Sequence, residues 1–295
     1  MLIAAAAGLV FAACHPETGK VKDLRSSCDS GNQSACDDYA GKLQKGEYVL
    51  RDTKHAARLF DSACTKGIGK SCTSLGVILQ NGKGAKKDSA RAINVFRKGC
   101  DGGAMEGCAR LGLLVRDGVG ITRDPAQAAA LFQQACNGKD MIGCSSLGAL
   151  YASGQGVAQD YSKAAMLLQQ SCDTTVTRLG CAGLGELHLA GNGVPQNDSI
   201  AASLFRQACD FTDPASCLQW ARVNEEGRGV TRNYQRAANL YENACEDGNG
   251  EGCARLAVLY ENGAGRYRDA AYAAKLRKKA CNYGRTESCE KKKTT

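Results

Sequence analysis

The sequence predicts an all-α fold, a right-handed superhelical solenoid of helix pairs, and three observations lead to it. Cysteines recur in pairs with a period of 36 residues and a single step of 37. Each repeat carries two segments with apolar residues at helical spacing, separated by a glycine-containing turn. The one extra residue falls between Cys172 and Cys181, where a loop tolerates an insertion. A self-similar period of about 20 to 50 residues is typical of a solenoid, in which each repeat buries its apolar face against its neighbours.

The repeat region opens with a short helix ending at Cys28, which we interpret as a half-repeat cap, and seven helix pairs follow. The first helix of each pair, helix A, is predicted at 34–45, 70–81, 106–117, 142–153, 179–190, 215–226 and 251–262. The second, helix B, is predicted at 53–65, 88–100, 125–136, 161–172, 198–209, 234–245 and 269–281.

The turn between helix A and helix B has a pattern of its own, as in GVGITRD at 118–124 and GRGVTRN at 227–233. Glycine just past a helix permits the left-handed conformation that satisfies the last carbonyl groups. The Asp or Asn that closes the turn is expected to cap helix B. The first turn, GEYVLRD, and the last, GAGRYRD, depart most from the pattern, which is typical of capping repeats.

Seventeen cysteines resolve into eight pairs, spaced C-x7-C or once C-x8-C, and leave Cys14 alone. Zinc sites favour shorter spacings and usually recruit histidine, of which the chain has three, so we expect no metal site. Each pair joins the end of one helix to the start of the next, which predicts local disulfides, with reduced structural thiols as the alternative. The predicted bonds are Cys28–Cys36, Cys64–Cys72, Cys100–Cys108, Cys136–Cys144, Cys172–Cys181, Cys209–Cys217, Cys245–Cys253 and Cys281–Cys289.

The amino-terminal segment indicates export, in agreement with disulfides that persist in an oxidising compartment. Residues 1–13 are almost wholly apolar, too short to span a membrane, and end in small residues, as a signal peptide does. With Cys14 next, the segment resembles a bacterial lipoprotein lipobox, which implies lipidation of Cys14. We expect a tether over 14–22, one continuous solenoid over 23–290 and a basic tail over 291–295. The expected location is the bacterial periplasm, the outer membrane or the extracellular space.

The repeat itself carries a recognisable set of motifs. L-G-x-L-Y in helix A, G-x-G-V in the turn and A-x-x-L-F-x-x-A-C in helix B together resemble the Sel1-like repeat. With a cysteine pair in every repeat, residues 17–289 are similar to the Helicobacter cysteine-rich protein family of secreted Sel1-like proteins. Tetratricopeptide repeats are the related alternative, but their period is about 34 residues and they lack this turn and these cysteines.

Catalytic motifs are almost absent from the sequence, which has no G-x-S-x-G, no H-E-x-x-H and no Walker loop. The family resemblance implies one enzymatic alternative, because its members are penicillin binders and weak β-lactamases. A serine β-lactamase uses S-x-x-K, and the sole match runs from Ser288 to Lys291 in the terminal segment. We therefore expect no catalytic residue and no cofactor. The interpretation is a non-catalytic scaffold, with β-lactam binding or weak hydrolysis as the alternative.

The remaining functional candidate is a surface, which we name the helix A ladder. It comprises the residues two and five positions after the second cysteine of each repeat, which are expected to point away from the core. At position two stand Asp38, Ser74, Arg110, Ser146, Gly183, Gln219 and Arg255. At position five stand Gly41, Val77, Leu113, Ala149, Glu186, Arg222 and Val258.

Helix A lines the inner wall of helical-repeat proteins, so the ladder is the predicted surface for an unknown protein or peptide partner. Ordinary solvent-facing surface is the alternative. The residues selected as binding candidates are Val77, Arg110, Leu113, Glu186, Arg222, Arg255 and Val258. The net charge of +8 is modest, and basic residues alternate with acidic ones, which favours solvated faces over a nucleic-acid surface. We expect a monomer that contacts a membrane through a lipid on Cys14.

Overall fold

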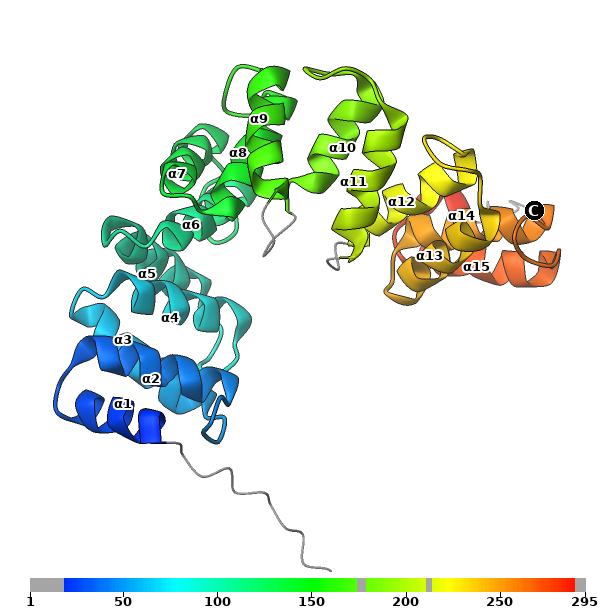
Figure 1. Cartoon of the computed structure of the whole chain (residues 1–295). Helices are drawn as coiled ribbons and strands as arrows, with labels where there is room; N and C mark the ends of the chain where they lie inside the picture. The colour runs from blue at the N-terminus through cyan, green and yellow to red at the C-terminus, as the bar shows by residue number, and fades with distance from the viewer. Residues whose placement is uncertain (1–18, 174–178, 211–213, 290–295) are drawn as a thin grey trace, which may run out of the picture. The chain divides into compact units, whose positions relative to one another are not determined.

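The computed structural model describes residues 19–173, 179–210 and 214–289. Within these residues the chain forms fifteen α-helices and one short 3-10 helix, with no strand (Figure 1). Within each of two parts of the chain, helices that follow each other in the sequence pack together. The prediction of an all-α solenoid of helix pairs is confirmed. The helices fall into two compact units, Met1–Asp140 and Met141–Thr295, which we call unit 1 and unit 2.

Unit 1 contains the half-repeat cap and three helix pairs. Its helices are α1 (Gly19–Asp29), α2 (Gln33–Lys45), α3 (Thr53–Thr65), α4 (Gly69–Asn81), α5 (Ser89–Asp101), α6 (Met105–Asp117) and α7 (Pro125–Asn137). Helix α1 begins inside the stretch predicted as a tether over 14–22, because Val21 packs into the core with only 2% of its surface exposed. The predicted signal peptide over 1–13 and the candidate lipid site Cys14 lie outside the described residues.

Unit 2 contains four helix pairs. Its helices are α8 (Met141–Ser153), α9 (Tyr161–Cys172), α10 (Cys181–Ala190), α11 (Asp198–Asp210), α12 (Pro214–Glu226), α13 (Tyr234–Glu246), α14 (Gly250–Asn262), α15 (Ala270–Asn282) and the 3-10 helix Thr286–Ser288. The predicted bounds agree with these to within two residues. The largest difference is at α10, which starts two residues late, after the longer loop. The predicted tail over 291–295 lies beyond the described residues.

Local chemistry accounts for the ends of the helices. Gly118 follows α6 with a φ of 70°, and its N–H donates to the carbonyl of Leu114. Asp88 and Asp160 each accept a hydrogen bond from a backbone N–H in the first turn of the helix B that follows. These contacts satisfy groups that a helix end leaves without a partner.

Close contact between neighbouring repeats requires the second glycine of the turn. Gly84 has a φ of 111°, and a Cβ placed on it would lie 2.4 Å from the carbonyl oxygen of Thr53. Thr53 begins helix B of the preceding repeat, so the turn of one repeat rests directly on the helix start of the one before. Gly229 makes the equivalent approach to the carbonyl of Asp198 in unit 2. A side chain at this position would separate neighbouring repeats.

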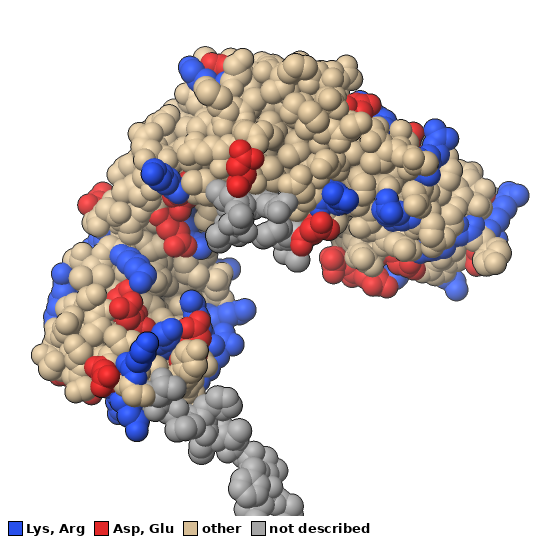
Figure 2. All heavy atoms as spheres, viewed as in Figure 1, with Lys and Arg blue, Asp and Glu red and all other residues tan. Residues whose placement is uncertain are grey.

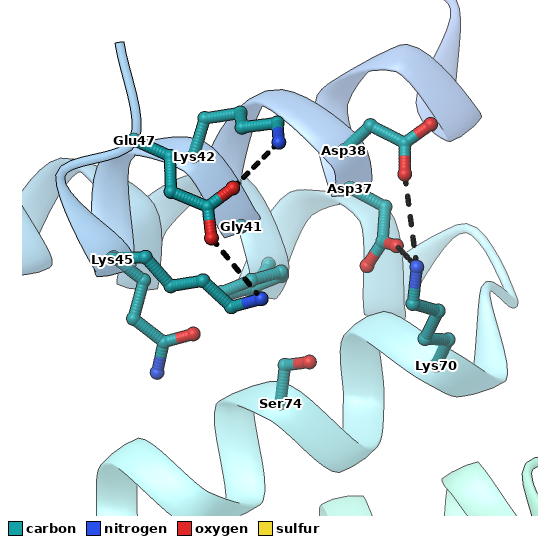
Figure 3. Close-up of a pocket in the computed structure, with 10 residues that line it drawn as sticks. Asp37, Asp38, Gly41, Lys42, Lys45, Glu47, Lys70 and Ser74 are labelled. Atoms are coloured by element: carbon teal, nitrogen blue, oxygen red, sulfur yellow. Dashed lines mark hydrogen bonds and ion pairs between the residues drawn. The ribbon is translucent and has the colours of Figure 1, made fainter. Parts of the chain in front are cut away.

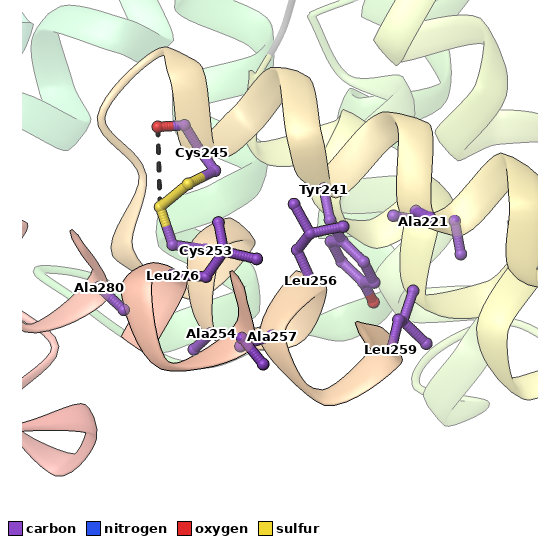
Figure 4. Packing of buried hydrophobic residues seen from close by; sticks show 13 residues of the cluster. Ala221, Tyr241, Cys245, Cys253, Ala254, Leu256, Ala257, Leu259, Leu276 and Ala280 are labelled. Atoms are coloured by element: carbon purple, nitrogen blue, oxygen red, sulfur yellow. Dashed lines mark hydrogen bonds between the residues drawn. A yellow bond between two sulfur atoms is a disulfide. The ribbon is translucent and has the colours of Figure 1, made fainter. Parts of the chain in front are cut away.

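The core repeats one arrangement along the chain. A large side chain stands four residues before the first cysteine of each pair, and in six repeats it is buried: Phe60, Phe96, Phe132, Leu168, Phe205 and Tyr241. Four repeats place a glycine of helix A against it, and a Cβ on Gly112 would lie 2.6 Å from the Phe132 ring. Figure 4 shows the corresponding core in unit 2, where Tyr241 packs beside Ala221 and Leu256.

Disulfides close the repeats. Six of them join the last turns of one helix to the first turn of the next helix A, and Cys281–Cys289 joins the end of α15 to the residue after the 3-10 helix, with Cα atoms 4.5 to 4.9 Å apart. These seven are Cys28–Cys36, Cys64–Cys72, Cys100–Cys108, Cys172–Cys181, Cys209–Cys217, Cys245–Cys253 and Cys281–Cys289. Cys136 and Cys144 are also disulfide-bonded. The structure therefore contains disulfides rather than reduced thiols.

Candidate binding surface

The helix A ladder is largely accessible. Of the seven binding candidates, Glu186 is exposed and the other six are half-buried: Val77, Arg110, Leu113, Arg222, Arg255 and Val258. The three aliphatic candidates are thus partly covered by their neighbours, although ladder positions were expected to point away from the core. At Ser146 the expectation that ladder positions point away from the core is wrong, because this side chain is buried with 8% exposed. A short side chain at this position ends below the surrounding surface, whereas an arginine extends beyond it.

One hollow on the ladder, called the first hollow, lies in unit 1 between helices α2 and α4. It has a volume of about 230 Å³ and is floored by Phe60 of α3. Charged side chains of both signs surround it (Figure 3). Its rim carries Asp38 and Ser74, which are ladder residues at position two of adjacent repeats.

A buried carboxylate organises one side of this first hollow. Asp37 has only 5% of its surface exposed, yet its Oδ1 accepts a hydrogen bond of 2.7 Å from the Ser71 hydroxyl. Its Oδ2 lies 3.0 Å from Nζ of Lys70. The hydrogen bond to Asp37 raises the pKa of the Lys70 ammonium, which stays charged at neutral pH. The carboxylate therefore has both the charge partner and the hydroxyl donor that a buried acid requires.

The opposite side of the first hollow holds a second ion pair. Nζ of Lys42 lies 2.6 Å from Glu47, and Nζ of Lys45 lies 3.5 Å from the same carboxylate. The hydrogen bond from Lys42 lowers the pKa of Glu47. Figure 3 shows these pairs on either side of the hollow. Its rim is thus charged but internally paired, which is a suitable setting for polar groups of a ligand.

The second hollow lies in unit 2, between helices α12 and α14, and has a volume of about 240 Å³. Tyr241 of α13 forms its floor, and Leu218 supplies an apolar wall. Two of the predicted binding residues, Arg222 and Arg255, stand on its rim with 41% and 39% of their side chains exposed.

Glutamates hold the groups of the second hollow in place. The Tyr241 hydroxyl donates a hydrogen bond of 2.8 Å to Glu225. Burial raises the pKa of the phenol, and this hydrogen bond raises it further. Nε of Arg255 lies 3.0 Å from Glu251, which also pairs with Arg285. Nε of Arg222 lies 3.4 Å from Glu226 but makes no hydrogen bond there, although the atom is buried. Of the two rim arginines, Arg222 is therefore the less tightly held.

The two hollows occupy equivalent places in their repeats. Each lies between helix A of one repeat and helix A of the next. Each is floored by the residue four positions before a first cysteine, Phe60 before Cys64 and Tyr241 before Cys245. Each has ladder position two of both flanking repeats on its rim, which are Asp38, Ser74, Gln219 and Arg255. The ladder therefore carries the same kind of concavity twice, with different charges around it.

The other binding candidates do not line either hollow. Arg110 forms an ion pair of 2.7 Å with Glu106, one helical turn away. Glu186 accepts a hydrogen bond of 3.3 Å from the ladder residue Gln219. Sequence reasoning missed Asp37, Lys70 and Tyr241. An acid at the position after the second cysteine, where the other six helices A carry Ala, Thr, Ser or Leu, was a visible signal for Asp37.

Neither metal chemistry nor a membrane span is indicated within residues 19–173, 179–210 and 214–289. No group of three or more His, Cys, Asp or Glu residues is arranged there to hold a metal ion. No helix in the described part of the chain has both the length and the apolar character needed to cross a bilayer.

Comparison with known proteins agrees with the repeat structure. The Sel1 repeat model matches seven times along the chain, at 34–68, 69–103, 106–140, 142–173, 179–210, 214–249 and 250–283. The chain belongs to the Sel1 repeat family. The family predicted from the motifs is therefore confirmed. No curated protein sequence matches the chain significantly.

Solved Sel1-repeat structures are similar over most of this chain. A protective antigen of uropathogenic Escherichia coli is 25% identical with a TM-score of 0.68, covering 91% of this chain and 57% of that one. A Sel1 repeat protein of Oxalobacter formigenes is 21% identical with a TM-score of 0.65, covering 91% and 77%. Cysteine-rich protein B of Helicobacter pylori is 25% identical with a TM-score of 0.34, covering 44% and 90%. This chain thus spans little more than half the length of the E. coli protein.

Sel1-repeat proteins are scaffolds that generally mediate protein–protein interaction. In this Sel1-repeat chain the many disulfides indicate an oxidising, exported location.

Proposed function

We propose that this Sel1-repeat protein is a non-catalytic interaction scaffold that acts outside the bacterial cytoplasm and binds a protein or peptide on its helix A ladder. The observation that carries the proposal is the pair of equivalent hollows, each open on the ladder. Arginine is enriched among the residues that supply most of the energy at protein interfaces, and the rim of the unit 2 hollow offers Arg222 and Arg255.

Rigidity supports the same proposal. A disulfide in the connection between repeats restricts the motion of one helix pair against the next. A surface that is held in its binding conformation loses little conformational entropy when a partner docks. The many covalent links therefore suit a preformed docking surface better than a site that closes around a substrate.

Export and anchoring complete the proposal. We propose that residues 1–13 direct secretion and that Cys14 carries a lipid, which would place the scaffold at the periplasmic or outer-membrane surface. The support is the apolar segment that precedes Cys14 and the odd number of cysteines, seventeen, which leaves Cys14 outside the eight pairs. Mass spectrometry of the protein isolated from its membrane fraction tests this, because an acylated amino-terminal Cys14 is expected. A mature terminus at any other residue would exclude it.

The alternative, β-lactam binding or weak hydrolysis, rests on family resemblance. Ser288 of its sole S-x-x-K motif is buried, with 9% of its surface exposed. Lys291 lies outside the described residues. A chromogenic β-lactam assay on the oxidised, repurified protein separates the two functions, since the scaffold proposal expects no turnover above the uncatalysed rate.

The binding test begins by capturing partners from a cell-envelope extract, identifying them by mass spectrometry and purifying one for titration. The variant R222A/R255A removes both rim arginines of the unit 2 hollow. The matched control R206A/R268A removes two exposed arginines of unit 2 that lie off the ladder. Exposed charges contribute about 0–1 kcal/mol to folding, so both variants should remain folded.

We expect R222A/R255A to weaken the affinity at least tenfold and R206A/R268A to leave it unchanged. A third variant, R110A/L113A, changes the ladder away from the hollows and tells whether binding extends along it. Equal effects of R222A/R255A and the off-ladder control would show that the ladder does not bind the partner.

A further inference from the structure

One edge of unit 1 combines exposed cations with exposed apolar side chains. We name it the basic turn edge and define it by Tyr48, Leu50, Arg51, Lys83, Lys86 and Lys87. All six residues are exposed, and the two apolar ones have 60% and 68% of their surface accessible. In Figure 2, Lys and Arg side chains stand out along the margin of unit 1 on which the turns α2–α3 and α4–α5 lie.

Two consecutive turns form this edge, and backbone packing holds them together. The first turn, 46–52, leads into α3, and the second, 82–88, leads into α5. The close approach of Gly84 to the carbonyl of Thr53 places the second turn against the start of α3. Lys83 and Arg51 therefore belong to one continuous surface, although 31 residues separate them in the sequence.

The cations of the basic turn edge have no acidic partner among the described residues. Arg51, Lys83, Lys86 and Lys87 form no ion pair there. The nearby acids are already engaged: Asp52 and Asp88 accept backbone hydrogen bonds as helix caps. Glu47 pairs with Lys42 and Lys45. The positive charge of this edge is therefore available to a partner.

The equivalent edge of unit 2 carries less unpaired positive charge, because two of its four arginines are paired with acids. Arg228 lies 2.9 Å from Asp198, and Arg266 lies 2.8 Å from Glu242. These arginines are neutralised within the protein. Arg232 and Arg268 of the same turns form no ion pair among the described residues, so the unit 2 edge has two such cations over four turns where the unit 1 edge has four over two.

The start of helix α1 lies at the same edge and adds to its positive charge. Helices α1 and α3 run in the same direction, so the start of α1 at Gly19 lies along the same edge as the start of α3 (Figure 1). Lys20 and Lys22, in the first turn of α1, are exposed and extend the positive surface. Eighteen residues precede Gly19, including the apolar segment 1–13. The described part of the chain thus begins at its basic turn edge.

We infer that the basic turn edge docks on an anionic phospholipid surface. Lysine and arginine are attracted to such a surface by about 1 kcal/mol each, and tyrosine favours the boundary between lipid and water. Tyr48 and Leu50 would enter the headgroup region, while Arg51 and the three lysines of the second turn contact lipid phosphates. This contact does not depend on the helix A ladder or on acylation, and it would orient unit 1 at the membrane.

The experiment measures co-sedimentation of the full chain with vesicles, and every protein carries Cys14→Ser so that no acyl group contributes. Vesicles of phosphatidylcholine alone report binding by other apolar segments. Vesicles with about one third phosphatidylglycerol report the charge-dependent part. The test variant is K83Q/K86Q/K87Q, and the matched control K275Q/K278Q/K279Q removes three exposed lysines from α15 of unit 2.

We expect K83Q/K86Q/K87Q to lower the phosphatidylglycerol-dependent partition coefficient on the order of 100-fold, and the control to change it less than threefold. Added salt should weaken binding of the parent chain, because surface charges are screened. Equal losses in the two variants, or none in the first, would overturn the inference.

A second variant separates a membrane from other anionic partners. Y48G/L50T places at these positions residues that the chain itself uses there, glycine as at Gly84 and threonine as at Thr122. We expect it to weaken vesicle binding without changing the net charge. If it has no effect, and the parent binds soluble polyglutamate as tightly as it binds vesicles, the edge is a site for acidic proteins and the membrane inference is wrong.

Discussion

Two repeats fill the same core position with opposite chemistry. In α6–α7, the ring of Phe132 is fully buried against Gly112. In α14–α15, the equivalent residue four positions before the first cysteine is Arg277, whose side chain is 41% exposed. Its guanidinium forms two hydrogen bonds, of 2.6 and 2.7 Å, with Glu261. An apolar contact in one repeat is thus a surface ion pair in the other.

The difference follows from what covers helix B. In α7, Ala129 has only 5% of its surface exposed, whereas the equivalent Ala274 of α15 is exposed. Among the described residues, α15 is followed by a single 3-10 turn rather than by another helix A. A large apolar ring would face water there. The repeat pattern therefore fixes where a side chain points, and the neighbouring repeat decides whether that side chain should be apolar.

The largest expected effect comes from removing the buried ring. Phe132→Ala should destabilise the repeat by about 3–5 kcal/mol, because it removes a large apolar contact and leaves a cavity. Hydrogen exchange followed by mass spectrometry should show the loss of protection concentrated in α6 and α7. If Phe132→Ala and Arg277→Ala cost the same, the contrast between the two repeats is wrong.

Disulfide removal tests whether the two repeats differ in covalent bracing. Replacing Cys100 and Cys108 together by alanine should cost about 2.5 kcal/mol, by the loop-entropy relation for a nine-residue ring. Replacing Cys281 and Cys289 together should cost about the same, because its ring has the same length. Thermal unfolding of the two double variants gives the comparison. A much larger loss at Cys100 and Cys108 would mean that the link between two helix pairs contributes stability beyond the closure of its own ring.

For Gly112→Ala, opposite the Phe132 ring, helix propensity and core packing predict changes in stability of opposite sign. Helix propensity alone predicts that Gly112→Ala stabilises the helix by about 1 kcal/mol. We expect destabilisation by about 1–3 kcal/mol instead, because the new Cβ would stand 2.6 Å from the Phe132 ring. Urea unfolding monitored by far-UV circular dichroism decides between the two. Ala257→Gly, opposite Arg277, is the control and should cost about 1 kcal/mol through propensity.

The smallest effect is expected at the ion pair. Arg277→Ala should cost about 0–1 kcal/mol, since an exposed pair is screened by water. The hydrogen bond from Arg277 lowers the pKa of Glu261 and raises that of Arg277. A lowered carboxyl pKa contributes stability above the ordinary glutamate value of about 4.3, and this is lost as the pH falls through the folded-state pKa.

The variant should therefore differ from the parent at pH 7 and converge with it in acid. Thermal unfolding of both proteins between pH 7 and pH 2.5 measures this. A difference that persists at pH 2.5 would assign the role of Arg277 to packing of its aliphatic stem.

The candidate surface was predictable in part. Helical spacing placed Arg222 and Arg255 on the ladder, and the structure brings both to the rim of one hollow. The same spacing left Ser146 on the ladder, where it is buried. The spacing of residues in the sequence gives the direction in which a side chain points from its own helix axis. Whether the neighbouring helix covers that side chain depends on the distance between the two helix axes. The sequence spacing carries no information on that distance.

By itself, the sequence determined the all-α repeat, the bounds of its helices and the caps at their ends. These depend on interactions within a few residues, such as Asp88 with the backbone of α5. The tertiary structure alone decided the contacts between repeats. They include the two hollows, the approach of Gly84 to Thr53 and the bond from Tyr241 to Glu225. A periodic sequence specifies each repeat locally, but a contact between repeats depends on how closely they stack, which only the packed side chains set.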